Sequence, residues 1–151
     1  MATLYGVNST KRDVNVPPDQ IPGYDQSGRL KVFYDEYTLL ADLGSADVIN
    51  LMKLPKGCRV LDAILYTDAM GGSCACKVGW AASSDAAEAA DDDALLAAAT
   101  SLVSAARKSM AAEAGRGKVL AGEVQVQLTT SAVSSSATGN KLRLAVIVAM
   151  P

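Results

Sequence analysis

Apolar and polar residues alternate with a period of two along much of the chain, a pattern typical of β-strands that bury one face. The alternating segments are residues 29–43, 48–53, 58–68, 74–80, 118–130 and 141–150. Glycine, proline, asparagine and serine separate these segments, as they separate strands elsewhere. The sequence therefore predicts a mostly β protein.

Residues 47–80 form the centre of this pattern and predict three consecutive strands with two turns. Pro55 and Gly57 mark the first turn, and Gly71-Gly72 is a hairpin signal before the third strand. The third strand places these residues on one face: Cys74, Cys76, Val78 and Trp80. We interpret this face as core, with a subunit interface as the alternative role for Trp80.

Residues 29–43 and 141–150 also alternate as strands do. In residues 29–43, Leu30, Val32 and Tyr34 share one side, and Phe33 lies on the other. The segment 141–150 directs Leu142, Leu144, Val146 and Val148 inward, yet its outward positions include Ala145, Ile147 and Ala149. The second half of 141–150 is therefore apolar on both faces, which predicts a central strand or a subunit contact for this segment.

Residues 84–114 depart from the β pattern, and we predict a helical insertion here. The residues at helical spacing are Leu95, Leu96, Ala99, Leu102, Val103, Ala106 and Met110. Asp91, Asp92 and Asp93 precede this stripe, and Arg107 and Lys108 fall near its end, which matches a helix dipole. The acidic group Asp85, Glu88 and 91–93 lacks the ligand spacing of a calcium loop, so dipole complementation is the preferred account.

Residues 1–28 are polar and interrupted by Pro17-Pro18 and Pro22-Gly23, which leaves no room for a long helix. Their apolar residues are spaced as in an extended segment that buries one side at a time. We expect an extended N-terminal arm laid over a neighbouring subunit, with a disordered leader as the alternative. Residues 29–151 would then form one β-sandwich domain.

Composition excludes several classes of function. The net charge of −2 offers no electrostatic basis for binding nucleic acid or an anionic membrane. No apolar run reaches the roughly 20 residues of a membrane span, and Met1 does not open a signal peptide, which indicates synthesis in a cytoplasm. Without histidine, and with only three cysteines, neither a zinc site nor a hydrolase triad can be assembled. We predict no enzyme activity, no cofactor and no metal, with the cysteines as small buried apolar residues.

The order of elements resembles the head decoration (cement) proteins of tailed bacteriophages. The resemblance rests on the strand at 47–49, the Leu-Pro-Lys-Gly turn at 54–57, the Val-Leu-Asp strand at 60–62, Gly71-Gly72 and the Val-Gly-Trp strand at 78–80. The opening residues 1–8 and the closing strand 141–150 sit where such proteins have their arm and last strand. The resemblance covers most of the chain except 83–117.

This resemblance implies a single jelly-roll-like β-sandwich that binds the outer surface of a phage capsid and reinforces contacts between major capsid subunits. The partners would be the major capsid protein and further copies of the chain, as a homotrimer first and a dimer second. The expected contact residues lie in the arm: Leu4, Tyr5, Val7, Lys11, Arg12 and Val16. The alternatives are another virion part, such as a head-fibre base or tail protein, and a cellular carbohydrate- or peptide-binding module using loops 83–117 and 131–140.

Overall fold

The computed structural model describes residues 29–110, 114–135 and 137–151. These residues form β-strands joined by turns and loops, and they contain no helix. The strands are β1 (Arg29–Thr38), β2 (Val48–Leu54), β3 (Arg59–Thr67), β4 (Ala75–Trp80), β5 (Asp91–Ser101), β6 (Ala106–Ser109), β7 (Val124–Ala132) and β8 (Lys141–Met150). The prediction of a mostly β protein is confirmed.

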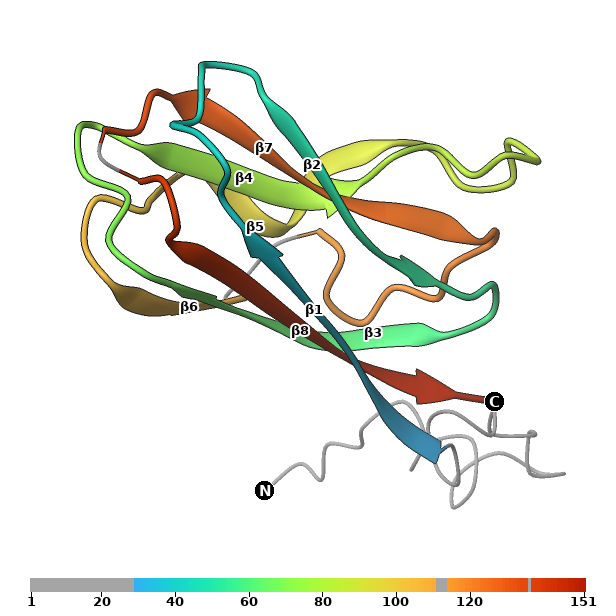
Figure 1. The fold of residues 1–151 in the computed structure, drawn as a ribbon. Coiled ribbons are helices and arrows are strands. Elements are labelled where there is room, and N and C mark those ends of the chain that lie inside the picture. Colours follow the sequence, from blue (N-terminus) through green and yellow to red (C-terminus); the bar gives the residue numbers. More distant parts are fainter. Residues whose placement is uncertain (1–28, 111–113, 136) are drawn as a thin grey trace, which may run out of the picture.

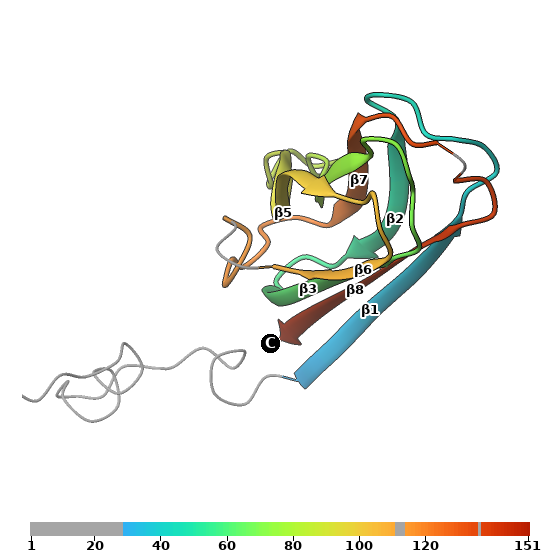
Figure 2. The ribbon, with the colours of Figure 1, turned by 90° about the vertical axis from the view of Figure 1, so that its left-hand side faces the viewer.

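The strands form two antiparallel sheets that pack face to face (Figures 1 and 2). Sheet A has the order β1-β8-β3-β6, and sheet B has the order β2-β7-β4-β5. Successive strands change sheet at every connection except the one from β4 to β5. This alternation is the strand order of a jelly roll, in which two Greek keys enclose one core. The predicted β-sandwich is therefore present.

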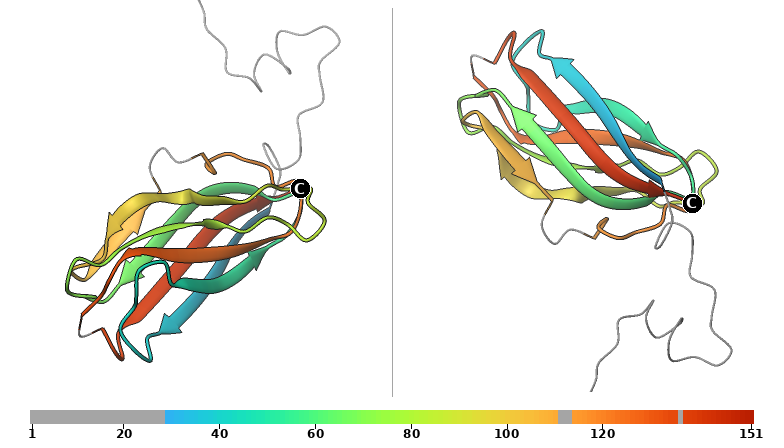
Figure 3. Two further views of the ribbon diagram at one scale, coloured as in Figure 1. Left: turned by 90° about the horizontal axis from the view of Figure 1, so that it is seen from above. Right: turned by 90° about the horizontal axis from the view of Figure 1, so that it is seen from below.

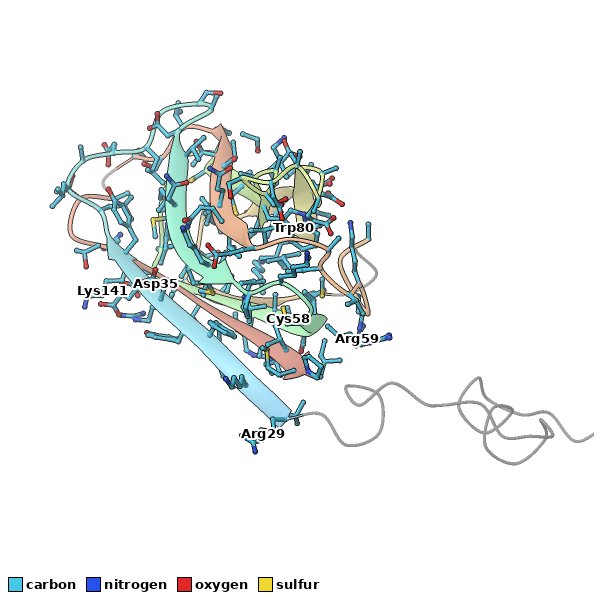
Figure 4. The ribbon with its side chains drawn as sticks, turned by 90° about the vertical axis from the view of Figure 1, so that its right-hand side faces the viewer. Arg29, Asp35, Cys58, Arg59, Trp80 and Lys141 are labelled. Carbon is cyan, nitrogen blue, oxygen red and sulfur yellow. The ribbon has the colours of Figure 1, made fainter. Side chains whose placement is uncertain are left out.

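The inward faces of both sheets form the core that the alternation predicts. On β8, Leu142, Leu144, Val146 and Val148 are all buried, and β8 is a central strand between β1 and β3. The predicted face of β4 is buried as well, from Cys74 to Trp80. Figure 4 shows Trp80 and Cys58 between the two sheets. The core-facing positions of these strands were thus predicted correctly.

The Gly71-Gly72 turn does not make a hairpin, which corrects that prediction. β3 lies in sheet A between β8 and β6, whereas β4 lies in sheet B between β7 and β5. Both glycines do adopt positive φ angles, of 62° and 57°, so the local turn is real. The link 68–74 instead crosses between the sheets, where the N–H of Met70 donates to the carbonyl of Leu102 (2.9 Å). A turn reverses the direction of the chain locally, but it does not determine which strand the next strand pairs with.

The predicted helical insertion at 84–114 is also wrong for the residues that the structure describes. This segment supplies β5, which pairs with β4, and β6, which pairs with β3. Leu95, Leu96 and Leu102 are buried, as their apolar stripe suggested, but strands and a connecting link bury them. The acidic residues at 91–93 consequently have no helix dipole to complement.

Irregular pairing explains why β5 has apolar residues at helical spacing. The register of β5 against β4 shifts on both sides of the Val78–Leu96 pair, and Ala99 has a φ of 65°. Such bulges break the strict alternation of a strand. Gly79 allows the close approach, because a Cβ there would lie 2.0 Å from the carbonyl oxygen of Asp91. Helix propensities differ by only about 0.7 kcal/mol per ordinary residue, so pairing and burial override them.

Candidate protein-docking face

Figure 3 (right) shows sheet A from the side turned away from sheet B. On this side, three adjacent strands carry apolar residues. The β1–β8 register places Val32 opposite Ile147 and Tyr34 opposite Ala145. On the other side of β8, Ala145 lies opposite Ile64 of β3. We call this set the outer face, and its members are Leu30, Val32, Tyr34, Ile64, Tyr66, Ala145 and Ile147.

The strand β1 contributes the most exposed part of the outer face. The side chains of Leu30, Val32 and Tyr34 are 69%, 63% and 58% exposed, whereas Phe33 packs partly against the core. Single apolar residues on a surface are ordinary, but a contiguous apolar set is typical of a surface that binds another protein. The outer face therefore has the composition of a docking surface.

An ion network closes one end of the outer face. Glu36 pairs with Lys141 (Oε1 to Nζ, 2.5 Å) and with Arg143 (Oε2 to Nε, 2.8 Å), and Arg143 also approaches Asp68 (3.6 Å). Hydrogen bonds from Lys141 and then Arg143 hold the pKa of Glu36 below its usual value. The outer face thus consists of an apolar surface with charged residues at one end. Many protein interfaces combine an apolar centre with a polar rim in this way.

The contact residues predicted from the sequence fall elsewhere. Leu4, Tyr5, Val7, Lys11, Arg12 and Val16 lie outside the described residues, so their role stays a prediction. The outer face was not predicted as a site. Its one sequence signal was the apolar character of both sides of 141–150, which indicated a central strand or a subunit contact.

The cysteines belong to the core and not to a reactive site. Cys58, Cys74 and Cys76 are free thiols and are buried. Burial raises the pKa of Cys58 to about 11 and that of Cys76 to about 12. The thiolate is the reactive form of cysteine, and a raised pKa leaves little of it at neutral pH. These thiols are therefore poorly reactive. Across the described ranges, no cluster of histidine, cysteine or carboxylate side chains could hold a metal ion.

Three of the predicted acidic residues have structural partners in place of a helix dipole. Asp85 accepts hydrogen bonds from the hydroxyl of Ser83 (2.6 Å) and from the backbone N–H of Ala87 (3.1 Å). Asp92 pairs with Lys77 of β4. Glu88 is buried and pairs with Lys118. These carboxylates hold loops and edges in place.

The segments 83–117 and 131–140, proposed as an alternative carbohydrate or peptide site, are only partly at one end of the sandwich (Figure 1). Residues 83–90 follow the end of β4 and lie at the end opposite to the link after β7, because β4 and β7 are antiparallel. The link 102–105 lies at the same end as that link, since Gly71 donates its N–H to Val103 and Ser135 donates its N–H to Met70. An open depression of about 170 Å³ lies near residues 83–90 and is lined in part by Ala82, Ser84 and Glu123. It is smaller than the roughly 300–1,000 Å³ of usual small-molecule sites. The carbohydrate- or peptide-binding alternative stays a prediction.

The described residues form an eight-stranded, jelly-roll-like sandwich. No protein-family model matches the sequence. No curated protein shows significant similarity to it. No helix of the described residues is long and apolar enough to cross a membrane.

Three solved structures of phage capsids contain chains of similar fold. A chain from the capsid asymmetric unit of cyanophage Pam1 has a TM-score of 0.69 at 19% identity, over 93% of this chain and 99% of that chain. A chain from the capsid of Ralstonia phage GP4 has a TM-score of 0.68 at 22% identity, over 87% and 90%. A chain from the acid-stable capsid of Helicobacter pylori bacteriophage KHP30 has a TM-score of 0.51 at 15% identity, over 81% and 88%. At these identities the similarity shows the fold.

Proposed function

We propose that this chain is a non-enzymatic virion protein that binds the outer surface of a tailed-phage capsid and cements contacts between major capsid subunits. The observation that carries the proposal is the Pam1 match, which spans 93% of this chain and 99% of that one. The similarity is thus to a whole small chain of a capsid and not to one domain of a larger chain. The resemblance of residues 47–80 to head decoration proteins points the same way.

The outer face supports attachment by burial of apolar surface. Transfer of apolar surface out of water contributes about 25 cal/mol per Å², and the exposed side chains of Leu30, Val32, Tyr34 and Tyr66 make such surface available. A neighbouring capsid subunit would cover them. The charged residues at one end of the outer face, among them Glu36 and Arg143, would then set the orientation of the docked protein.

Cementing follows from mass action. A protein that binds the assembled lattice more tightly than the separated subunits stabilises the lattice by its binding free energy. Residues 1–28 would extend this contact, with Leu4, Tyr5, Val7, Lys11, Arg12 and Val16 on the capsid or on a sister copy. The preferred assembly is a homotrimer over a local symmetry axis, with a dimer second. Synthesis would take place in the host bacterial cytoplasm.

The test uses heads of the encoding phage that were assembled without this protein. The purified full-length chain should sediment with these heads at a saturable ratio and raise the temperature at which they release DNA. Electron cryomicroscopy of native particles should then place the chain on the outer head surface. Density for the chain in the tail or at a fibre base, or a failure to sediment with expanded heads, would contradict the proposal.

A further inference from the structure

The strand β1 is an edge strand of sheet A, and within the described ranges no strand lies on its other side. Natural proteins protect such edges with short strands, prolines, bulges or charged side chains. β1 has 10 residues, contains no proline and pairs with β8 without a register shift. The pairings of β2 with β7 and of β4 with β5 both shift. The edge of β1 is therefore long and regular, and its protection rests on charged side chains, which a partner strand of complementary charge can match.

Backbone groups of alternate β1 residues point to this free edge. The N–H of Leu39 donates to the carbonyl of Asn140 (2.9 Å), so Leu39 faces the β8 side. Because successive residues of an antiparallel strand face opposite sides, the even-numbered residues of β1 face away from β8. The N–H of Glu36 agrees, since the carboxylate of Asp35 accepts it at 2.8 Å. The residues with outward backbone groups in the first part of the strand are Leu30, Val32 and Tyr34.

The same three residues carry the exposed apolar side chains of the strand. On the other face of β1, Arg29 lies near one end and Asp35 lies further along the strand (Figure 4). The free edge thus combines hydrogen-bonding groups, apolar side chains and charges of both signs, with Arg29 and Lys31 toward one end and Asp35 toward the other. A partner strand with the reverse order of these features would fit it.

We propose that β1 pairs antiparallel with β1 of a second copy of this chain, about a two-fold axis at Val32. In this register Val32 lies opposite its counterpart, and Leu30 lies opposite Tyr34 of the other copy. On the opposite face, Arg29 lies opposite Asp35. Apolar pairs and opposite charges on adjacent strands both stabilise a sheet.

The backbone of Glu36 favours this register over its neighbour, in which the axis lies at Phe33. That neighbour would place Lys31 opposite Asp35, but it would also place Leu30 opposite Glu36, whose N–H is already bonded to the carboxylate of Asp35. The contact is isologous, so one strand supplies both halves of the interface. It joins the two copies of sheet A into one continuous sheet and doubles the outer face. This two-fold contact makes a dimer, the second of the two assemblies proposed above, in place of the homotrimer. It does not require a capsid and therefore goes beyond the proposed function.

Cysteine cross-linking tests the register directly. Residues directly opposite in hydrogen-bonded antiparallel pairs have Cα atoms about 5.5 Å apart, within the range of a disulfide. The full-length variant Val32→Cys should oxidise to a disulfide-linked dimer, and the native cysteines should not interfere because they are buried. Leu40→Cys is the control, because Leu40 is 84% exposed but lies beyond the end of β1. Equal cross-linking of both variants would overturn the proposal.

Charge reversal provides an independent measurement. Arg29→Asp or Asp35→Arg alone would place like charges opposite each other twice in the dimer and should raise the dissociation constant about tenfold. The double variant restores opposite charges and should return the constant to that of the original chain. Sedimentation equilibrium over a wide concentration range reports these constants. A monomer at every concentration, an assembly that none of these changes affects, or a double variant no better than the single ones would overturn the proposal.

Discussion

The amine of Lys118 lies 2.5 Å from the carboxylate of Glu88, which is 5% exposed, and 5.4 Å from the centre of the Trp80 ring. The backbone N–H of Ala121 donates to the other carboxylate oxygen (2.9 Å). The indole N–H of Trp80 in turn donates to the carbonyl of Ala89 (3.2 Å). These contacts join the loop after β4 to the segment before β7 and close one end of the sandwich.

This ion pair predicts a dependence of stability on pH. Burial raises the pKa of Glu88, but the hydrogen bonds from Lys118 and Ala121 outweigh it, so the net pKa lies below the usual 4.5. A pKa that is lower in the folded state gives stability that is complete above the unfolded value and is lost as the pH falls through the folded value. Glu88→Gln should therefore lower the free energy of unfolding by about 1–3 kcal/mol at neutral pH. In acid the difference from the original chain should shrink.

Urea unfolding across a pH series measures this difference. Glu123→Gln is the matched control, because Glu123 pairs with Lys53 at 3.2 Å while both side chains are more than half exposed. Such a pair contributes less than about 1 kcal/mol. Equal effects of the two substitutions at neutral pH would contradict the role assigned to the buried pair.

The contact between Gly79 and β5 predicts a strong effect of one added methyl group. A Cβ at Gly79 would lie 2.0 Å from the carbonyl oxygen of Asp91 and 2.5 Å from the carbonyl carbon of Asp92, so the backbone of β5 would have to move. Gly79→Ala should lower the free energy of unfolding by at least about 1–3 kcal/mol. Gly44→Ala is the control, since its nearest atom would be a side-chain oxygen at 3.3 Å. Thermal unfolding of both variants measures the effect, and similar midpoints would contradict the packing described.

The buried thiols predict slow labelling in the folded state. With the pKa of Cys76 raised to about 12 and that of Cys58 to about 11, little thiolate forms at neutral pH. A thiol-specific chromogenic reagent should label the native cysteines only as urea unfolds the chain. An added thiol in Leu40→Cys should react at once, since position 40 is exposed. Rapid labelling of the unchanged chain before unfolding would show that the core opens.

The proposed attachment to a capsid predicts that an aromatic residue of the outer face contributes to affinity. Tyr66 is 41% exposed on the outer face, and Val103, with 40% exposure, lies on the link from β5 to β6. Tyr66→Ser should weaken binding to heads about tenfold, as expected for an interface aromatic residue, without unfolding the chain. Val103→Ser should leave binding unchanged. Sedimentation of each variant with heads compares them, and a larger effect at position 103 would place the contact elsewhere.

The limits of the sequence pattern are clearest on β1. Alternation separates Leu30, Val32 and Tyr34 from Phe33, but both sets are apolar, so the pattern does not show which set faces the core. The structure buries Phe33 in part and exposes the other three. A strand at the edge of a sheet contacts the core along only part of its length, and the position at the edge follows from the packing of other strands. The outer face was missed for this reason.

The sequence by itself determined the local features: the segments that extend, the turn at Gly57, which has a positive φ, and the inward residues of β4 and β8. These features depend on neighbours a few residues apart and on a single buried face. Only the tertiary structure decided that β3 and β4 lie in different sheets and that 91–101 is a strand. The physical reason is that these outcomes depend on backbone hydrogen bonds and burial against distant segments, which outweigh the small local preference of alanine and leucine for a helix.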